Sequence, residues 1–194
     1  VGQVAVYNRA LPTGAYLFPF GVFIGSAPGR PDMPCGSLVT KEGQAAFRAP
    51  GKDAPIVLDC SGAPSAGFIT LYLPEAERDR LLTISELLAY KPDARVAKPH
   101  SRRLSSQQTP PAMPPSPAPP IASMIPITAT SATLRSLYSG AYPATNAIDG
   151  NIRTICASGI LTSANDEWLS VGVAPNSPIG YVAIYNRDDY AWAT

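Results

Sequence analysis

Charge is scarce in this sequence, and its two signs are balanced. Only 15% of the 194 residues are charged, and the formal net charge at pH 7 is +1. Proteins that bind nucleic acids or acidic membranes through electrostatics gather Lys and Arg in excess. The composition therefore gives no electrostatic reason to expect a nucleic-acid partner or an acidic membrane surface.

Histidine and long apolar runs are also nearly missing. The single histidine is His100, and no Cys-x-x-Cys pair occurs, so a zinc site is not expected. Nucleophilic catalysis of the Ser–His or Cys–His type has no imidazole available outside a connecting segment, and no Gly-rich phosphate loop is present. No apolar run reaches the roughly 20 residues of a membrane-spanning helix. The sequence predicts neither an enzyme nor membrane insertion.

Proline and glycine are abundant instead. The 22 Pro and 15 Gly indicate a turn-rich β protein together with an extended segment. Short apolar segments, some alternating with a period of two residues, predict strands, most clearly where Ile69 and Leu71 alternate with Thr70 and Tyr72. The predicted strands are 1–9, 17–25, 55–60, 67–74, 81–90 and 179–187, and residues 165–173 predict a turn that enters a strand. For 81–90, which is rich in Leu, a short helix is the alternative. Residues 175–178 predict a turn. Residues 128–133 are rich in Ser, Thr and Ala, and their pattern predicts no particular element.

One strand sequence occurs twice. Residues 1–9 read VGQVAVYNR and residues 179–187 read IGYVAIYNR, so six of nine positions are identical and two more are Val/Ile exchanges. An internal repeat takes precedence over local assignments. Unless the match is accidental, we expect slightly more than one period of a longer repeat. Residues 1–90 would be the C-terminal half of one module, residues 91–120 a linker, and residues 121–194 the N-terminal half of the next module.

The linker has a composition of its own. Residues 109–120 read TPPAMPPSPAPP, which is typical of a polyproline II segment because proline fixes φ and removes backbone donors. Twelve residues at about 3.1 Å each make a spacer of roughly 37 Å. An inert linker or an SH3-type ligand are alternatives to a hydroxyproline-rich, O-glycosylated spacer of plant or green-algal type. The glycosylation candidates are Pro110, Pro111, Pro114, Pro115, Ser116, Pro117, Pro119 and Pro120.

The three cysteines are an odd number for a secreted protein. Cys35 and Cys60 are 25 residues apart in the first segment, and we expect them to form a disulfide, with two reduced core cysteines as the alternative. Cys156 is then left over, to bond within its completed module or across chains.

The pieces outside the linker resemble a discoidin-like, galactose-binding-like domain of the coagulation factor 5/8 C-domain family, closest to its fucolectin (F-type lectin) branch. The resemblance rests on ATNAIDGN at 144–151, WLSV at 168–171, the strand at 179–187 and LTISEL at 82–87. It implies an all-β fold, an antiparallel jelly-roll β-sandwich whose halves are joined by the polyproline II linker.

The resemblance also implies two sites. Calcium would be held by Asn146, Asp149, Asn151 and Glu86, oxygen ligands that suit a hard cation, although a plain turn with side-chain hydrogen bonds explains the same loop. Because Glu86 and the loop fall in different segments, this site needs the two halves present here to associate, or each module's missing half. The sugar site would use Arg187 and Asp189, with Arg9 in the first copy. It is degenerate, because the positions of its histidine and second basic residue are Ile160 and Thr194.

The combined interpretation is a structural repeat of a long extracellular glycoprotein fibre, of the kind found in green-algal cell walls or as mastigonemes on cilia. Its partners would be copies of itself or neighbouring repeats, O-linked glycans and other surface glycoproteins. The alternative is a secreted multivalent carbohydrate-binding protein, in which tandem modules raise avidity.

Overall fold

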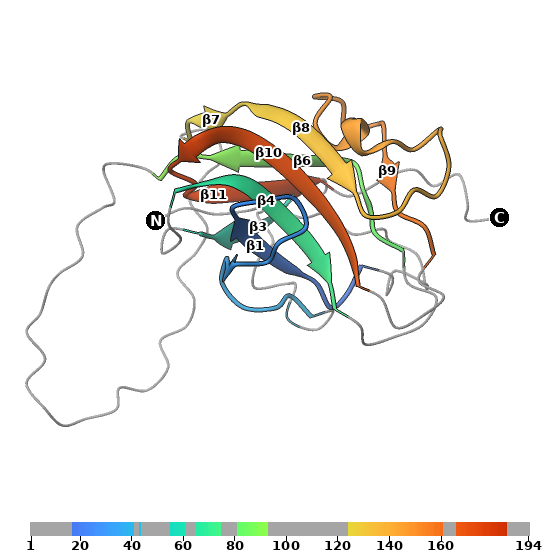
Figure 1. Cartoon of the computed structure of the whole chain (residues 1–194), viewed down its shortest axis with the longest axis horizontal. Coiled ribbons are helices and arrows are strands. Elements are labelled where there is room, and N and C mark those ends of the chain that lie inside the picture. The colour runs from blue at the N-terminus through green and yellow to red at the C-terminus, as the bar shows by residue number, and fades with distance from the viewer. Residues whose placement is uncertain are drawn as a thin grey trace, which may run out of the picture.

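The protein is described by a computed structural model over residues 17–40, 43, 55–60, 65–74, 81–92, 124–160 and 166–185. The regular structure in these ranges is β-strand apart from short 3-10 turns, which confirms the all-β prediction (Figure 1). No helix in these ranges is both long and apolar enough to cross a membrane. The predicted strand at 1–9 and residues 93–120 of the linker lie outside the described residues.

The larger sheet has five antiparallel strands. Their spatial order is β2 (Met33–Pro34), β1 (Gly21–Gly25), β4 (Ala66–Leu73), β10 (Glu167–Ser177) and β8 (Ala129–Leu134). The alternation predicted for β4 is confirmed, since Ile69, Leu71 and Leu73 are fully buried in the core.

Two details of this sheet differ from the sequence prediction. The turn predicted at 175–178 is wrong for its first three residues, because β10 continues to Ser177 through a register shift after Gly172 and a positive φ of 60° at Asn176. Strand β8 was not predicted, because its Ser, Thr and Ala side chains are exposed or half-buried at the edge of the sheet and show little apolar alternation.

The smaller sheet consists of β11 (Tyr181–Tyr185), β6 (Glu86–Tyr90) and β7 (Pro126–Ile127), again antiparallel. Strand β3 (Ile56–Asp59) lies beside β11, where the Cys60 N–H donates to the Gly180 carbonyl at 2.9 Å. Strands β5 (Thr83–Ile84) and β9 (Cys156–Ala157) form a separate pair. The predicted strand over 81–90 is thus confirmed, with an interruption at Ser85, and the helix alternative is wrong.

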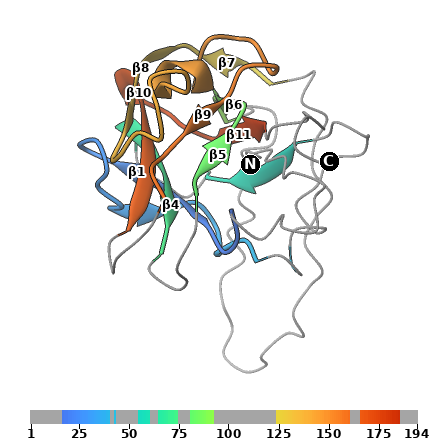
Figure 2. The ribbon, with the colours of Figure 1, turned by 90° about the vertical axis from the view of Figure 1, so that its right-hand side faces the viewer.

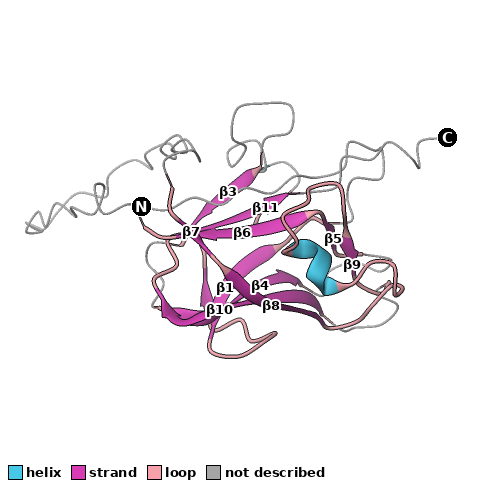
Figure 3. Ribbon diagram, turned by 90° about the horizontal axis from the view of Figure 1, so that it is seen from above, coloured by secondary structure: helices cyan, strands magenta, loops and turns pink. Residues whose placement is uncertain are grey.

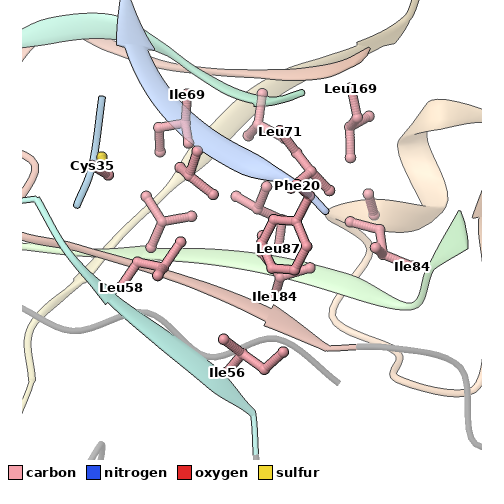
Figure 4. Close-up of a cluster of buried hydrophobic side chains, with 14 of the residues drawn as sticks. Phe20, Cys35, Ile56, Leu58, Ile69, Leu71, Ile84, Leu87, Leu169 and Ile184 are labelled. Atoms are coloured by element: carbon pink, nitrogen blue, oxygen red, sulfur yellow. The ribbon is translucent and has the colours of Figure 1, made fainter. Parts of the chain in front are cut away.

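The two sheets form two layers with the hydrophobic core between them (Figures 2 and 3). The larger sheet and the segment leading into it contribute Phe20, Leu71 and Leu169, and the other layer contributes Leu58, Leu87 and Ile184 (Figure 4). The 3-10 helix η3 (Ala144–Ala147) lies at one end of the layers near β9 and buries Ala147 in the same core.

Strands from both sides of residues 93–123 are neighbours in both sheets. In the larger sheet β4 pairs with β10, and in the smaller sheet β6 pairs with β11. The Thr70 and Ser170 hydroxyls, 100 residues apart in sequence, are 3.0 Å apart in the buried part of the β4–β10 pair. The first and second segments therefore build one common core.

The disulfide between Cys35 and Cys60 is confirmed. It joins the residue after β2 to the residue after β3, and thereby ties the larger sheet to the strand beside β11. Closing a loop of this length contributes roughly 3 kcal/mol on the chain-entropy model. Cys156 is a free, buried thiol in β9.

Leu71→Ala tests whether the shared core determines stability. Leu71 is fully buried between the layers, so we expect its truncation to lower the free energy of unfolding by about 2–5 kcal/mol. The matched control is Leu38→Ala, because Leu38 is 51% exposed and its loss should change the free energy by less than about 1 kcal/mol. Urea unfolding followed by fluorescence measures both. Equal effects of the two substitutions would contradict the described core.

Candidate functional site

The loop that follows η3 is closed at its base. Ala147 packs in the core at its start, and Ile155 is buried at its end. Next to Ala147, the Asn146 side-chain amide Nδ2 donates to the Ile155 carbonyl at 2.8 Å and joins the two ends of the loop. This bond uses the nitrogen of Asn146 rather than the oxygen that a cation would need. The loop from 148 to 154 is therefore held at both ends while its middle is exposed.

The middle of the loop is a series of side-chain turns. The Asp149 carboxylate accepts hydrogen bonds from the Asn151 N–H at 2.8 Å and from the Thr154 hydroxyl at 2.7 Å. The Asn151 side-chain oxygen accepts the Arg153 N–H at 3.1 Å. Gly150 has a φ of +75°, a conformation that glycine adopts at little cost. These are the hydrogen bonds expected of the plain-turn interpretation.

Glu86 lies underneath this loop. Its residue begins β6 and is only 2% exposed, whereas Asp149, Gly150 and Asn151 are exposed above it. The backbone N–H groups of Gly150 and Asn151 are close enough to lower the pKa of its carboxyl, and Asp149 is close enough to repel it. Its Oε2 atom is buried without any hydrogen-bond partner. The two segments of the chain thus bring a buried acid against the loop that carries Asp149.

Burial is the main cause of an unusual pKa at Glu86. Desolvation raises it to about 7, the Gly150 N–H opposes this rise, and Asp149 adds to it. None of the groups that shift the pKa of Glu86 is positively charged, so nothing of that kind offsets its burial. Burial likewise raises the pKa of Cys156 to about 12, with a further contribution from Glu86, so the thiol stays protonated at neutral pH.

The structure brings parts of the predicted calcium site close together. Glu86 lies close to Asp149 and to the backbone of Asn151, and Asn146 supports the base of the same loop. In the described part of the chain, no group of three or more His, Cys, Asp or Glu side chains could hold a metal. A cation here would have two carboxylates at most and would take its remaining oxygens from amide side chains, backbone carbonyls and water.

The other predicted site residues are not brought together by described structure. Arg9, Arg187, Asp189 and the glycosylation candidates at 110–120 lie outside the described residues. Ile160, at the position where the resemblance expects a histidine, is 52% exposed.

Glu167 is a second buried acid, which the sequence did not indicate. Glu167 at the start of β10 is buried, and its Oε1 accepts the Ser136 hydroxyl at 2.6 Å, while Oε2 has no partner. Ser136 Oγ also accepts the Gly159 N–H at 2.9 Å. Burial raises the pKa of Glu167, partly offset by Ser136 and Arg135. Its contacts join β10 to two loops, and its position in a polar turn sequence gave no signal of this.

Comparison with known proteins finds no matching family model, no matching curated protein and no matching solved structure. The interpretation of the site therefore rests on its geometry alone.

Glu86→Gln tests the electrostatics of the site. The folded-state pKa of Glu86 lies above the ordinary 4.5, so folding favours the protonated acid. Its stabilising effect is complete below about pH 4.5 and is lost as the pH rises through about 7, because the unfolded chain then holds fewer protons. With a metal chelator present, we expect the free energy of unfolding of the wild-type chain to fall by roughly 2–3 kcal/mol between pH 5 and pH 8. The Glu86→Gln substitution should remove most of this fall.

Urea unfolding at both pH values measures this difference. Asp166→Asn, which removes one carboxylate elsewhere in the chain, controls for the change in net charge. The same pH dependence in wild type and Glu86→Gln would show that Glu86 does not titrate in this way.

Proposed function

We propose that this chain is a structural repeat of a long extracellular fibre-forming glycoprotein, of the algal cell-wall or ciliary mastigoneme type. The observation that carries the proposal is the shared core. Strands before and after the proline-rich run pair in both sheets, although more than 30 residues separate Pro92 from Met124. A body completed by segments on both sides of the run supports an array in which modules and proline-rich runs alternate along the chain.

In this proposal residues 1–90 and 121–194 are complementary halves of jelly-roll modules. The antiparallel pairing and the two layers support a β-sandwich, for which we propose the jelly-roll connectivity, and the repeated strand at 1–9 and 179–187 supports a periodic chain. Each module would be completed either within one chain or by its neighbour. The proposal assigns no catalytic residues, and its partners are neighbouring repeats, attached glycans and other surface glycoproteins.

The extracellular setting is supported by the disulfide. Cys35–Cys60 links strands of both layers, and such bonds persist in oxidising compartments. The proline-rich run would serve as the spacer, with hydroxylated prolines and Ser116 as glycan acceptors. Within one chain the run returns to the same body, because Tyr90 lies opposite Pro126 and the Lys91 N–H donates to the Ile125 carbonyl at 2.9 Å. It would hold neighbouring modules apart only where each half pairs with the half of a neighbouring copy.

Glycopeptide mass spectrometry of the native protein across residues 109–120 tests the spacer. We expect hydroxyproline carrying pentose or hexose chains at several of these prolines. Unmodified proline throughout would overturn the glycosylated-spacer part of the proposal. A peptide from residues 124–135 of the same digest serves as the control, since it contains one proline in a described strand.

We further propose that calcium binds at Glu86, Asp149 and Asn151. A divalent cation would neutralise the repulsion between the two acids and give the unpartnered Glu86 Oε2 a ligand role. Binding requires the ionised form of Glu86, so it competes with the proton that this buried acid holds at neutral pH.

Millimolar calcium should therefore raise the thermal unfolding midpoint by several degrees at pH 8 and by less at pH 5.5. Asp149→Asn should remove most of the increase, whereas Asp166→Asn should retain it. Differential scanning calorimetry with calcium, with magnesium and with chelator measures the effect. Identical midpoints in calcium and chelator at pH 8 would contradict the calcium site.

A secreted multivalent lectin remains the competing function. Retention on sugar columns with elution by a single monosaccharide would favour it over the scaffold. The exposed Ile160 gives it no support from the described residues, because an aliphatic side chain offers sugar hydroxyls no hydrogen bond.

A further inference from the structure

Strand β11 fills a closely defined position. It pairs with β6 along its whole length, from Tyr181 opposite Tyr90 to Tyr185 opposite Glu86. The preceding residue, Gly180, donates its N–H to the Tyr90 carbonyl and accepts the Cys60 N–H, each at 2.9 Å. The position is therefore bounded by β6 on one side and by the end of β3 on the other.

Each residue of this segment meets a specific demand. Ile179, Val182 and Ile184 are buried in the core between the layers, and Ala183 is buried on the opposite face. Gly180 has no room for a side chain, because a Cβ atom there would lie 2.5 Å from the Pro92 Cα atom. Only a sequence with glycine at this point and aliphatic residues at the three core positions fits.

Residues 1–7 meet the same demands. Val1, Val4 and Val6 align with the three core positions, and Gly2 and Ala5 align with Gly180 and Ala183. The one non-conservative difference is Gln3 in place of the buried Tyr181. A chance similarity of β-strand composition would not be expected to reproduce the glycine at the position where a Cβ atom collides with Pro92.

We infer that residues 1–7 of one copy of this chain can occupy the β11 position of a second copy, joining copies by strand exchange. The sequence holds two segments that fit and one position that accepts them. The exchanged strand makes a heterologous contact, since it leaves one copy and enters another, and such contacts generate open filaments when they do not close. The inference specifies how the proposed fibre is joined and rests on that proposed function for its setting only.

The local strand has the advantage of being tethered. β11 follows β10 after a short connection, so its effective concentration at the position is high and exchange needs crowding of copies or weakening of β11. Because the two strands compete for one position, substitutions of Gly180 and Gly2 should have opposite effects on exchange. Gly180→Val should disfavour the internal strand, and Gly2→Val should disfavour the entering one, both through the collision with Pro92.

Disulfide trapping between two different copies tests the inference. Ala183 lies opposite Leu88, so Ala5 of an exchanged strand would lie opposite Leu88 of the receiving copy. We mix full chains carrying Ala5→Cys with larger, tagged chains carrying Leu88→Cys, because directly opposed antiparallel residues are within disulfide reach. The mixed dimer is read on non-reducing gels. A single chain with Ala183→Cys and Leu88→Cys is the positive control.

We expect a mixed dimer whose yield rises with concentration. Gln3→Tyr in the entering copy, which restores the residue of β11, should raise the yield severalfold, and Gly180→Val in the receiving copy should raise it as well. Gly2→Val should reduce it to background. If Gly180→Val prevents folding, the comparison between Gln3→Tyr and Gly2→Val still decides the matter.

Three results would overturn the inference. One is absence of a mixed dimer in every variant while the positive control closes. Another is a mixed dimer that Gly2→Val leaves unchanged. The third is cross-linking only within single chains that carry both Ala5→Cys and Leu88→Cys, which would assign residues 1–7 to their own copy. If no mixed dimer is trapped but the prolines carry glycans, strand exchange alone is refuted. If a mixed dimer is trapped but the prolines are unmodified, the glycosylated spacer alone is refuted.

Discussion

The pairing of β4 with β10 and of β6 with β11 is the constraint on which the rest of the structure depends. Each pair joins a strand that precedes residues 93–123 to a strand that follows them, so each of the two layers is completed only when both segments are present. Either segment alone would lack strands of both sheets, and the core between the layers would be incomplete. The buried position of Glu86 beneath the 149–151 loop has the same origin, because the acid and the loop come from different segments.

The sequence was informative where side chains alternate or chemistry is specific. β4 was predictable from the alternation of Ile69, Leu71 and Leu73. The Cys35–Cys60 bond was predictable because the rest of the chain resembles an extracellular protein. β8 was not predictable, because an edge strand of Ser, Thr and Ala has little apolar periodicity. The continuation of β10 through Pro175 was also missed, since a register shift and the positive φ of Asn176 let turn-forming residues remain in a strand.

The candidate site shows the same division. The residue types at 146, 149 and 151 suggested oxygen ligands, and the structure brings two of them against Glu86. Sequence alone could not reveal that Glu86 would be almost fully buried with an unpartnered oxygen, because burial follows from the association of the two segments. Nor could it reveal Glu167, whose burial depends on loops contributed by residues 136 and 159.

The separation of paired strands also determines when this fold can form. Thr70 and Ser170 are 100 residues apart, and the edge of β4 that receives β10 stays unpaired until β10 leaves the ribosome. At about 5–20 residues per second, this interval lasts roughly 5–20 seconds. Contacts of such high sequence separation slow folding, and an open edge in a crowded compartment attracts strands of other chains. Synthesis itself thus gives neighbouring copies time to meet before each one closes on its own second segment.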